Sequence, residues 1–490
     1  MTSKDTGPPA STSVLQVVQS ADGQSDGASV SVTLGEPLRI LPGRREVYEA
    51  TLSSGKAIVA KGYLPHPKQD RDWRREWNGL VRLNQLDLAA PKPVCVATDP
   101  VSGTVWVIMK YIRNMVPLQQ AFAEANACQA ETLAFRLIRL LDAAHDKGVA
   151  QADQHIDNWG FDGSQIYMLD AGTVTFSPHA LGTRRVIADL AALYVTLAIR
   201  DRRLFQLAIL QHYLNTNPEE KLPVIAGRRL VDQTARYQKK RLLRYYNKTR
   251  RNCTEFGRKE KKGAVMLFSR GAAADLVEQF WADPEALMQT GERLKSGNTC
   301  TVQSVAWADR RYVLKRYNLK PFASRLRRAL SDSRALKSWS HGWVLEMAFI
   351  PTARPVAVYE ERRAGLRGRC YLLMEQIDGQ LLPDYVAAQA KNPKRLEVVA
   401  DAVAEIWTGL AEIRAVHGDL KATNWIVDSE HRVHLIDLDS FEFGCSKSAF
   451  ARGRKKDRAR FMKNWSYDSA LERLFRQRLG RDDMEAPVYS

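Results

Sequence analysis

The apolar residues of this chain fall into short runs that are separated by polar stretches. Short apolar runs predict buried strands at residues 57–61, 105–109, 312–315 and 433–436. Longer segments with apolar residues at helical spacing predict helices at residues 71–86, 133–144, 185–200 and 335–349. The mixture of predicted strands and helices agrees with an α+β protein.

The pattern repeats at a nearly constant distance along the chain. The apolar run Val107–Ile112 matches Leu372–Ile377 at an offset of 265 residues, and Pro93 matches Pro355 at 262. Three further pairs keep a similar offset: Asp153 and Asp419, Asp170 and Asp437, and Asp189 and Asp457. Five pairs with nearly equal offsets indicate a duplication, and therefore two related domains in tandem.

The second copy carries a motif with chemical meaning. Asp419 and Asn424 are five residues apart, and Asp437 ends the strand predicted at 433–436. This is the spacing of a kinase catalytic loop followed by a metal-binding aspartate. Phosphoryl transfer needs a carboxylate near the acceptor hydroxyl, and an amide oxygen and a second carboxylate for Mg²⁺. We interpret Asp419 and Lys421 as catalytic residues and Asn424 and Asp437 as metal ligands; a chance match is the alternative.

The first copy repeats the same spacing with two changes. Asp153 is the catalytic candidate, and Asn158 and Asp170 are the candidate metal ligands. Gln151 stands where a histidine is typical, and His155 stands where the second copy has Lys421. The sequence leaves open whether this copy transfers phosphate.

Each copy also offers a lysine on a predicted strand. Lys61 resembles the strand lysine that holds the α- and β-phosphates of ATP, and Glu76 on the following helix is its expected partner. An exposed surface pair is the alternative for these two residues. Lys315 is the corresponding lysine of the second copy. Its partner is not evident, because Asp332 and Glu346 are both poorly spaced for the role.

Composition agrees with a protein of two or three domains. The chain has 490 residues, of which 45% are hydrophobic, and it has no run of 18 apolar residues. We find no signal peptide pattern, and the six cysteines are scattered, as is typical of free thiols in a reducing compartment. We therefore expect a cytoplasmic protein, with peripheral attachment to the inner membrane as a further possibility.

The net charge of +18 is concentrated in two segments. Residues 221–262 hold fifteen Lys and Arg against three acids, and residues 447–463 hold eight against Asp457 alone. Solvated helix faces are the simplest explanation. The functional alternative is attraction to an acidic membrane surface or a phosphorylated glycolipid. Nucleic acid ranks low, because no nucleic-acid-binding motif is present.

Four motifs of the second copy together resemble the lipopolysaccharide core kinases, the Kdo/heptose kinase family. They are Arg334–Trp339 with Gly342, Ile350–Pro355, His417–Lys421 and Ile436–Asp439. The resemblance covers roughly residues 290–465. It implies a protein-kinase-like fold, ATP and Mg²⁺ as cofactors, and a sugar hydroxyl of the inner core as acceptor. It also implies that Asp419 is the base, that Asn424 and Asp437 bind metal, and that Lys315 binds phosphate.

We thus predict two tandem protein-kinase-like bilobal domains, each with a small β-rich N-lobe and a helical C-lobe. The predicted boundaries are a disordered tail at 1–30, a first domain at 31–215, a basic helical segment or end of the first C-lobe at 216–263, and a second domain at 264–490.

The predicted function is ATP-dependent phosphorylation of a heptose or Kdo hydroxyl in the lipopolysaccharide inner core. A lipopolysaccharide core glycolipid or another acidic sugar is the expected substrate, and an anionic inner-membrane surface is the expected partner. Two alternatives stay open. The first is a kinase-fold enzyme acting on a protein or small metabolite, and the second is a scaffold with one inactive half.

Overall fold

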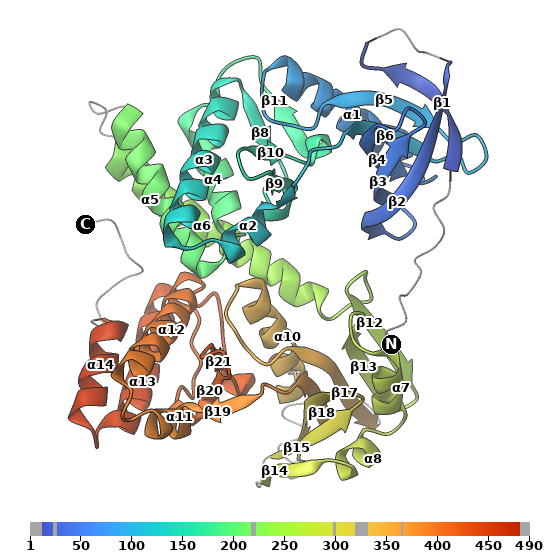
Figure 1. Cartoon of the computed structure of the whole chain (residues 1–490). Coiled ribbons are helices and arrows are strands. Elements are labelled where there is room, and N and C mark those ends of the chain that lie inside the picture. Colours follow the sequence, from blue (N-terminus) through green and yellow to red (C-terminus); the bar gives the residue numbers. More distant parts are fainter. Residues whose placement is uncertain are drawn as a thin grey trace. The chain divides into compact units, whose positions relative to one another are not determined.

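A computed structural model describes residues 12–22, 27–216, 222–296, 300–318, 332–363 and 366–480 (Figure 1). The chain divides into two compact units, Met1–Thr234 and Ala235–Ser490. The division falls inside helix α6 (Leu222–Lys248), within the segment 216–263 that the sequence left between its two predicted domains. Helices and strands are mixed in both units, as the α+β prediction requires.

The N-terminal unit opens with a closed six-stranded antiparallel barrel and one helix. The strand order is β1-β2-β3-β4-β6-β5. Its elements are β1 (Thr12–Ser20), β2 (Ser29–Leu41), β3 (Arg45–Leu52), β4 (Ala57–Tyr63), α1 (Gln69–Gln85), β5 (Pro93–Thr98) and β6 (Val105–Lys110). Strand β4 lies between β3 and β6, which places Lys61 opposite Val107 in the middle of the barrel wall.

Strand β1 corrects the predicted disorder of residues 1–30, since it lies within that tail. It pairs with β2 and β5, and it buries Leu15 and Val17. The segment alternates buried and exposed side chains, as a strand with one covered face does. The polar composition of residues 1–30 as a whole concealed this alternation. Residues 1–11 lie outside the described residues.

The rest of the N-terminal unit is mainly helical. Its elements are β7 (Val116–Pro117), α2 (Leu118–Glu124), α3 (Ala127–Asp146), β8 (Val149–Gln151), β9 (Trp159–Phe161), β10 (Ile166–Met168), β11 (Val174–Phe176), α4 (Thr183–Tyr194) and α5 (Ile199–Thr216). Helix α3 has a capping box at Asn126 and Gln129, and its apolar face is buried. The unit also has two small antiparallel sheets, β11-β8 and β10-β9-β7, and the loop that contains Asp153 connects β8 to β9.

The C-terminal unit opens with a seven-stranded antiparallel sheet in the order β12-β13-β17-β18-β16-β15-β14. The elements of this part are β12 (Phe256–Lys261), β13 (Ala264–Ser269), α7 (Ala274–Ala282), α8 (Pro284–Gln289), β14 (Glu292–Ser296), β15 (Cys300–Trp307), β16 (Arg310–Tyr317), α10 (Arg334–Met347), β17 (Pro355–Arg363) and β18 (Leu366–Glu375). Strand β12 pairs with β13, so this sheet begins before the predicted domain start at residue 264.

Helix α10 packs on this sheet through aromatic side chains. Trp339 and Trp343 are buried and meet the ring of Phe256 at centroid distances of 5.8 and 5.1 Å. Tyr245, from the end of α6, packs edge-on against the same phenylalanine. Such edge-to-face contacts add to the burial of apolar surface. The second half of α6 is therefore part of the C-terminal unit.

The remaining part of the C-terminal unit is helical, with one small sheet of order β19-β20-β21. Its elements are β19 (Gly379–Leu381), α11 (Leu382–Ala388), α12 (Pro393–Glu412), β20 (Trp425–Asp428), β21 (Val433–Leu435), α13 (Lys447–Met462) and α14 (Ser469–Leu479). Trp465, Phe461 and Phe475 form an aromatic cluster between α13 and α14. No helix within the described ranges has the length and apolar character needed to cross a bilayer.

Candidate active site

A buried carboxylate holds the loop between α12 and β20 in place by hydrogen bonds to its backbone. Asp457 of α13 accepts hydrogen bonds from the backbone N–H groups of His417 and Gly418, at 2.7 and 3.0 Å. Gly418 has a φ of 80°, and a Cβ there would lie 2.8 Å from the carbonyl oxygen of Ser440. Only glycine fits this turn without strain. The next residue, Asp419, is thereby fixed at the surface.

Asp419 is accessible and lies among positive charges. Its side chain is 38% exposed, and it forms ion pairs with Lys421 at 3.2 Å and with Arg460 of α13 at 3.1 Å. The amide of Asn424 donates to the backbone oxygen of Asp419 at 2.7 Å. The structure therefore brings together Asp419, Lys421 and Asn424, and the carboxylate can reach a molecule from solvent.

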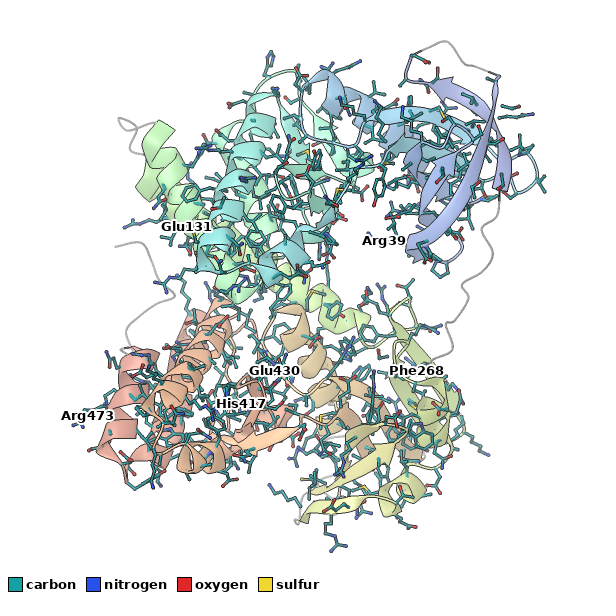
Figure 2. All side chains as sticks on the ribbon, in the orientation of Figure 1. Arg39, Glu131, Phe268, His417, Glu430 and Arg473 are labelled. Carbon is teal, nitrogen blue, oxygen red and sulfur yellow. The ribbon has the colours of Figure 1, made fainter. Side chains whose placement is uncertain are left out.

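The burial and the hydrogen bonds of His417 indicate a structural role for this side chain. It lies inside the C-terminal unit (Figure 2), fully buried, and its Nε2 is 3.0 Å from the carbonyl oxygen of Ile436. Burial lowers the pKa of this imidazole below its ordinary value. A neutral ring can donate to Ile436 from one nitrogen and accept the N–H of Asp419 at the other, which ties the catalytic loop to the following strand.

Lys315 of β16 meets two carboxylates at the end of β21. Its Nζ lies 2.7 Å from Oδ1 of Asp437 and 3.1 Å from Oδ1 of Asp439. Asp437 has a left-handed backbone with φ of 63°, which is unusual for a residue other than glycine. Such strain is typical of functional sites, where the surrounding structure maintains it.

Asp439 is the most enclosed acid of this group. Its side chain is 9% exposed, and it accepts hydrogen bonds from Tyr317 at 2.6 Å and from Ser338 of α10 at 2.9 Å; Arg334 also pairs with it. Burial raises the pKa of Asp439, but Lys315, Tyr317 and Arg334 together lower it below the ordinary value. The carboxylate is therefore ionised at neutral pH.

Burial and the neighbouring side chains have opposite effects on the pKa of the Lys315 ammonium. Burial lowers this pKa, whereas Tyr317 and the carboxylates of Asp439 and Asp437 raise it by more. The net pKa lies above that of an ordinary lysine, so the ammonium stays charged.

Sequence reasoning missed Asp439 as the partner of Lys315. Of its two candidates, Asp332 pairs with Arg250 at 2.7 Å. Both candidates came from the helical region, where such a partner is usual. The available signal was the acid two positions after Asp437, where the first copy has Gly172.

The N-terminal unit brings its own lysine, glutamate and aspartate together. Lys61 Nζ lies 2.8 Å from Oε2 of Glu76 and 3.5 Å from Oδ1 of Asp170. Glu76 is fully buried and also accepts the backbone N–H of Gly172 at 2.9 Å. Burial raises the pKa of Glu76, and Lys61 opposes that rise. The expected ion pair between Lys61 and Glu76 is present, and it is buried rather than on the surface.

The first-copy loop replaces the histidine contact by an amide contact. Gln151 donates to the carbonyl oxygen of Asp170 at 2.9 Å, much as His417 contacts Ile436. Asn158 donates to the backbone oxygen of Asp153 at 2.7 Å, as Asn424 does to Asp419. The loop geometry is thus kept although the typical histidine is absent.

Asp189 differs from its counterpart Asp457. Asp457 accepts two backbone N–H groups of its loop. The Oδ2 atom of Asp189 instead accepts a hydrogen bond from the side chain of Gln154 at 2.6 Å and lies 2.9 Å from Nε2 of His145.

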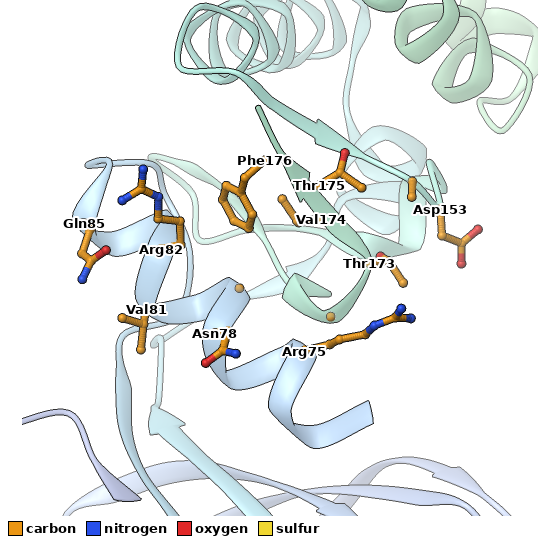
Figure 3. A pocket seen from close by; sticks show the side chains of 13 residues that line it. Arg75, Asn78, Val81, Arg82, Gln85, Asp153, Thr173, Val174, Thr175 and Phe176 are labelled. Atoms are coloured by element: carbon orange, nitrogen blue, oxygen red, sulfur yellow. The ribbon is translucent and has the colours of Figure 1, made fainter. Parts of the chain in front are cut away.

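A cavity of about 900 Å³ lies beside Asp153, between the exposed face of α1 and β11. Arg75 extends toward the side of the cavity on which Asp153 lies, and Arg82 lies toward the other side with Phe176 (Figure 3). The lining combines two guanidinium groups, side-chain amides, threonine hydroxyls and an aromatic ring. Most of the exposed lining is apolar, including Val81, Val174 and the ring of Phe176, and the two guanidinium groups are the features that would attract an anion.

The candidate metal ligands suit Mg²⁺ shared with a nucleotide. A backbone hydrogen bond of 2.9 Å from Ile436 to Asn424 holds the loop of Asn424 beside Asp437. Within the described part of the chain, no group of three or more His, Cys, Asp and Glu could hold a metal ion by itself. Mg²⁺ characteristically takes one or two protein carboxylates and completes its shell with phosphate and water oxygens. The donor set therefore fits.

A lysine, a strained aspartate and an exposed aspartate gathered in this way are typical of phosphotransferases of the kinase class. Residues 278–479 match the model of the lipopolysaccharide kinase (Kdo/WaaP) family. The segment that carries Lys315, Asp419 and Asp437 is therefore similar to a family of kinases. The match spans less than half of the chain and leaves out the N-terminal unit.

Solved structures of kinases are also similar, at low identity. A rhoptry antigen kinase domain of Toxoplasma gondii is 12% identical, covers 46% of this chain and 79% of its own, and has a TM-score of 0.31. A rhoptry kinase of the same organism is 13% identical, covers 41% of this chain and 66% of its own, and has a TM-score of 0.30. No curated protein matches the chain significantly.

Proposed function

We propose that the C-terminal half is an ATP-dependent kinase that phosphorylates a heptose or Kdo hydroxyl of the lipopolysaccharide inner core. One observation carries the proposal. Lys315 pairs with Asp437, and the loop of Asp419 and Asn424 is hydrogen-bonded to Ile436 beside that aspartate, within the segment that matches the lipopolysaccharide kinase family. The kinase class rests on that site, and the acceptor rests on the family match.

Each residue has a role that its surroundings support. Lys315 holds the phosphates of ATP, and Asn424 and Asp437 hold Mg²⁺, which neutralises charge on the transferred phosphoryl group. Asp419 accepts the proton of the acceptor hydroxyl, because it is the most exposed of the three carboxylates at this site, whereas Asp437 is paired with Lys315. Lys421 lies beside that carboxylate, where it stabilises negative charge on the incoming phosphate.

The charges around Asp419 favour an acidic acceptor. Lys421 and Arg460 both lie within ion-pair distance of its carboxylate. A phosphorylated or carboxylated sugar would be attracted to these cations as it approaches the base. The basic helices α6 and α13 would in addition favour an anionic membrane surface, where a lipid-linked acceptor is found.

The N-terminal half is proposed to be a second kinase-like domain that binds Mg-ATP. Its buried Lys61–Glu76 pair supports this, as does a backbone hydrogen bond of 2.8 Å from Leu169 to Asn158 that corresponds to the one between Ile436 and Asn424. The cavity beside Asp153 is the proposed site of its acceptor.

The acceptor is tested with radiolabelled ATP and a panel of molecules. The panel contains inner-core oligosaccharide stripped of phosphate, free heptose and Kdo, and a general protein substrate. Label transferred to the oligosaccharide supports the proposal. Label on the protein substrate or the free sugars alone would favour a different kinase-fold enzyme. ATP binding without transfer to any acceptor would favour a scaffold.

A further inference from the structure

We propose that Asp439 is the positioning residue of Lys315, and that it replaces the glutamate that serves Lys61 from helix α1. The inference rests on the proposed function of the C-terminal half, because it concerns the lysine that holds the nucleotide. The carboxylate has moved from the helix to the turn that follows the metal-binding Asp437.

The two lysines occupy matching surroundings. In each unit the residue two positions after the lysine is a tyrosine whose hydroxyl group contacts the lysine's carboxylate partner: Tyr63 reaches Glu76 at 3.4 Å, and Tyr317 reaches Asp439 at 2.6 Å. The carboxylates differ in origin, but the strand, the ammonium and the phenol are arranged alike.

A comparison of the two helices shows which residue of α10 stands at the position of Glu76 in α1. Glu76 directly precedes the fully buried Trp77 of α1, and Ser338 directly precedes the fully buried Trp339 of α10. The two tryptophans are 262 residues apart, the same offset as Pro93 and Pro355. Ser338 therefore stands at the position of Glu76, and its hydroxyl donates to Asp439 at 2.9 Å.

In the N-terminal unit, space disfavours a second carboxylate in the turn. Gly172 stands two positions after Asp170, as Asp439 stands two positions after Asp437. A Cβ on Gly172 would lie 2.8 Å from Oε2 of Glu76, which is too close for an unmoved carboxylate. A glutamate at this position of the helix thus disfavours a side chain in the turn, and the aspartate of the turn in the C-terminal unit is accompanied by a small helix residue, Ser338.

The exchange changes how the lysine can be controlled. A glutamate on a helix releases its lysine when the helix moves away, which is how many kinases are switched. Asp439 lies in the short 3-10 turn Leu438–Ser440 that follows Asp437, so the partner of Lys315 moves together with the metal ligand. Displacement of α10 would remove Ser338 and Arg334 from Asp439 but would leave the ion pair with Lys315.

The test measures nucleotide binding at the C-terminal site of the full chain. Lys61→Met is present in every protein, so that the N-terminal site is silent. Asp439→Asn keeps the shape and removes the charge, and it should weaken Mg-ATP binding by about tenfold or more, the usual loss for a charge-assisted contact. Ser338→Ala removes one neutral hydrogen bond to Asp439 and should weaken binding by only a few-fold.

A double variant separates positioning from a merely structural role. Asp439→Gly should weaken binding as Asp439→Asn does, and adding Ser338→Glu should restore most of it by recreating the arrangement of the N-terminal unit. Nucleotide binding by Asp439→Asn equal to that of the parent would overturn the inference. So would equally weak binding of the Asp439→Gly single and double variants when both melt like the parent. If the parent itself binds no Mg-ATP, the proposed function fails instead.

Discussion

Two lysines of this chain are held by carboxylates that come from different places in the sequence. Lys61 pairs with Glu76 of α1, and Lys315 pairs with Asp439 of a turn. An unpaired charge at such buried positions would be costly, so each carboxylate offsets the burial of its lysine and orients it. At the scale of residues, both halves therefore have a buried lysine held by a carboxylate, the pair that we propose to hold nucleotide phosphates.

This leads to a prediction about stoichiometry. The wild-type chain should bind about two molecules of Mg-ATP, and Lys61→Met and Lys315→Met should each lower this to about one, because each lysine serves its own site. Equilibrium dialysis with labelled nucleotide measures the number directly. Lys56→Met, an exposed lysine at the start of the same strand region, is the matched control and should change nothing. A Lys61→Met chain that still binds two nucleotides would contradict the assignment of the N-terminal site.

Motif spacing located most of the residues that meet at these sites, because a loop and the strand after it are close in sequence. Asp419, Asn424 and Asp437 were found in this way. The partner of Lys315 was not, because it depends on which of several acids the turn and α10 bring to the lysine. That choice is made by packing over more than 100 residues of sequence separation.

At the scale of elements, helices α1 and α10 each approach a neighbouring residue so closely that only a glycine fits at the contact. In α1 this approach occurs at Gly79, where a Cβ would lie 2.2 Å from the carbonyl oxygen of Ala171. The contact sets the height of Glu76, one turn earlier, over Lys61. In α10 the close approach occurs at Gly342, where a Cβ would lie 2.5 Å from the ring of Pro355.

We therefore predict that Gly79→Ala displaces α1. The displacement should cost about 1–3 kcal/mol of folding free energy, as overpacking commonly does. It should also weaken nucleotide binding at the N-terminal site, since Glu76 moves with the helix. Gly182→Ala is the control, because a Cβ there meets no atom within 4 Å. Thermal melting and nucleotide titration of both variants check this; equal behaviour of the two would show that the approach is not tight.

Elements with a clear apolar period were predictable and those without it were not. Helix α1 (Gln69–Gln85) lies within two residues of the predicted 71–86. Strand β1 was taken for disorder because residues 1–30 as a whole are rich in polar residues; within the strand Leu15 and Val17 are buried, whereas Val14 and Val18 are exposed. Its partners β2 and β5 supply the structure, and the pairing with β5 spans about 80 residues.

At the scale of the whole molecule, ionisable groups couple stability to pH. His341 of α10 lies among the rings of Tyr246, Phe441 and Phe443. Burial lowers its pKa to about 4, and the nearby Lys337 and Arg250 act in the same direction. Because the unfolded chain takes up the proton first, the stabilising effect is present above pH ~6.5 and is lost as the pH falls toward ~4.

The predicted contribution of His341 is on the order of 3 kcal/mol. Urea unfolding of the wild type and of His341→Phe should be compared at pH 7 and pH 4.5. The wild type should lose more stability than the variant between these two values, since phenylalanine has no proton to take up. Equal losses in the two proteins would contradict a buried neutral imidazole.

The basic residues of α6 and of the segment that follows it lead to a prediction about membrane binding. Lys248 and Arg250 are paired with Glu255 and Asp332. The variant proposed here changes five other basic residues of this region, namely Arg236, Lys239, Lys240, Arg244 and Arg251. Each contributes about 1 kcal/mol to binding at an anionic membrane surface, and salt screens the effect. Changing all five to Gln should abolish sedimentation with anionic vesicles at low salt while leaving ATP binding intact.

The control variant neutralises five basic residues elsewhere in the C-terminal unit. They are Arg310, Lys391, Lys394, Arg395 and Arg473. If both variants sediment equally poorly, net charge rather than this surface decides binding; if both sediment as well as the wild type, this surface is not the membrane anchor. The segment 447–463 would then be the next surface to test. The predicted basic stretch at 320–334 lies mostly outside the described residues.

The central claim is that the C-terminal half transfers phosphate from ATP to a sugar hydroxyl of the inner core, with Asp419 as base and Asp437 as metal ligand. The most direct measurement is mass spectrometry of dephosphorylated inner-core oligosaccharide after incubation with the full chain and Mg-ATP. The wild type and the surface variant Asp309→Asn should add a phosphoryl group to heptose or Kdo. Asp419→Asn and Asp437→Asn should each reduce the rate by at least about 100-fold. Undiminished transfer by both of these folded variants, or no transfer to the oligosaccharide by the wild type, would contradict the account.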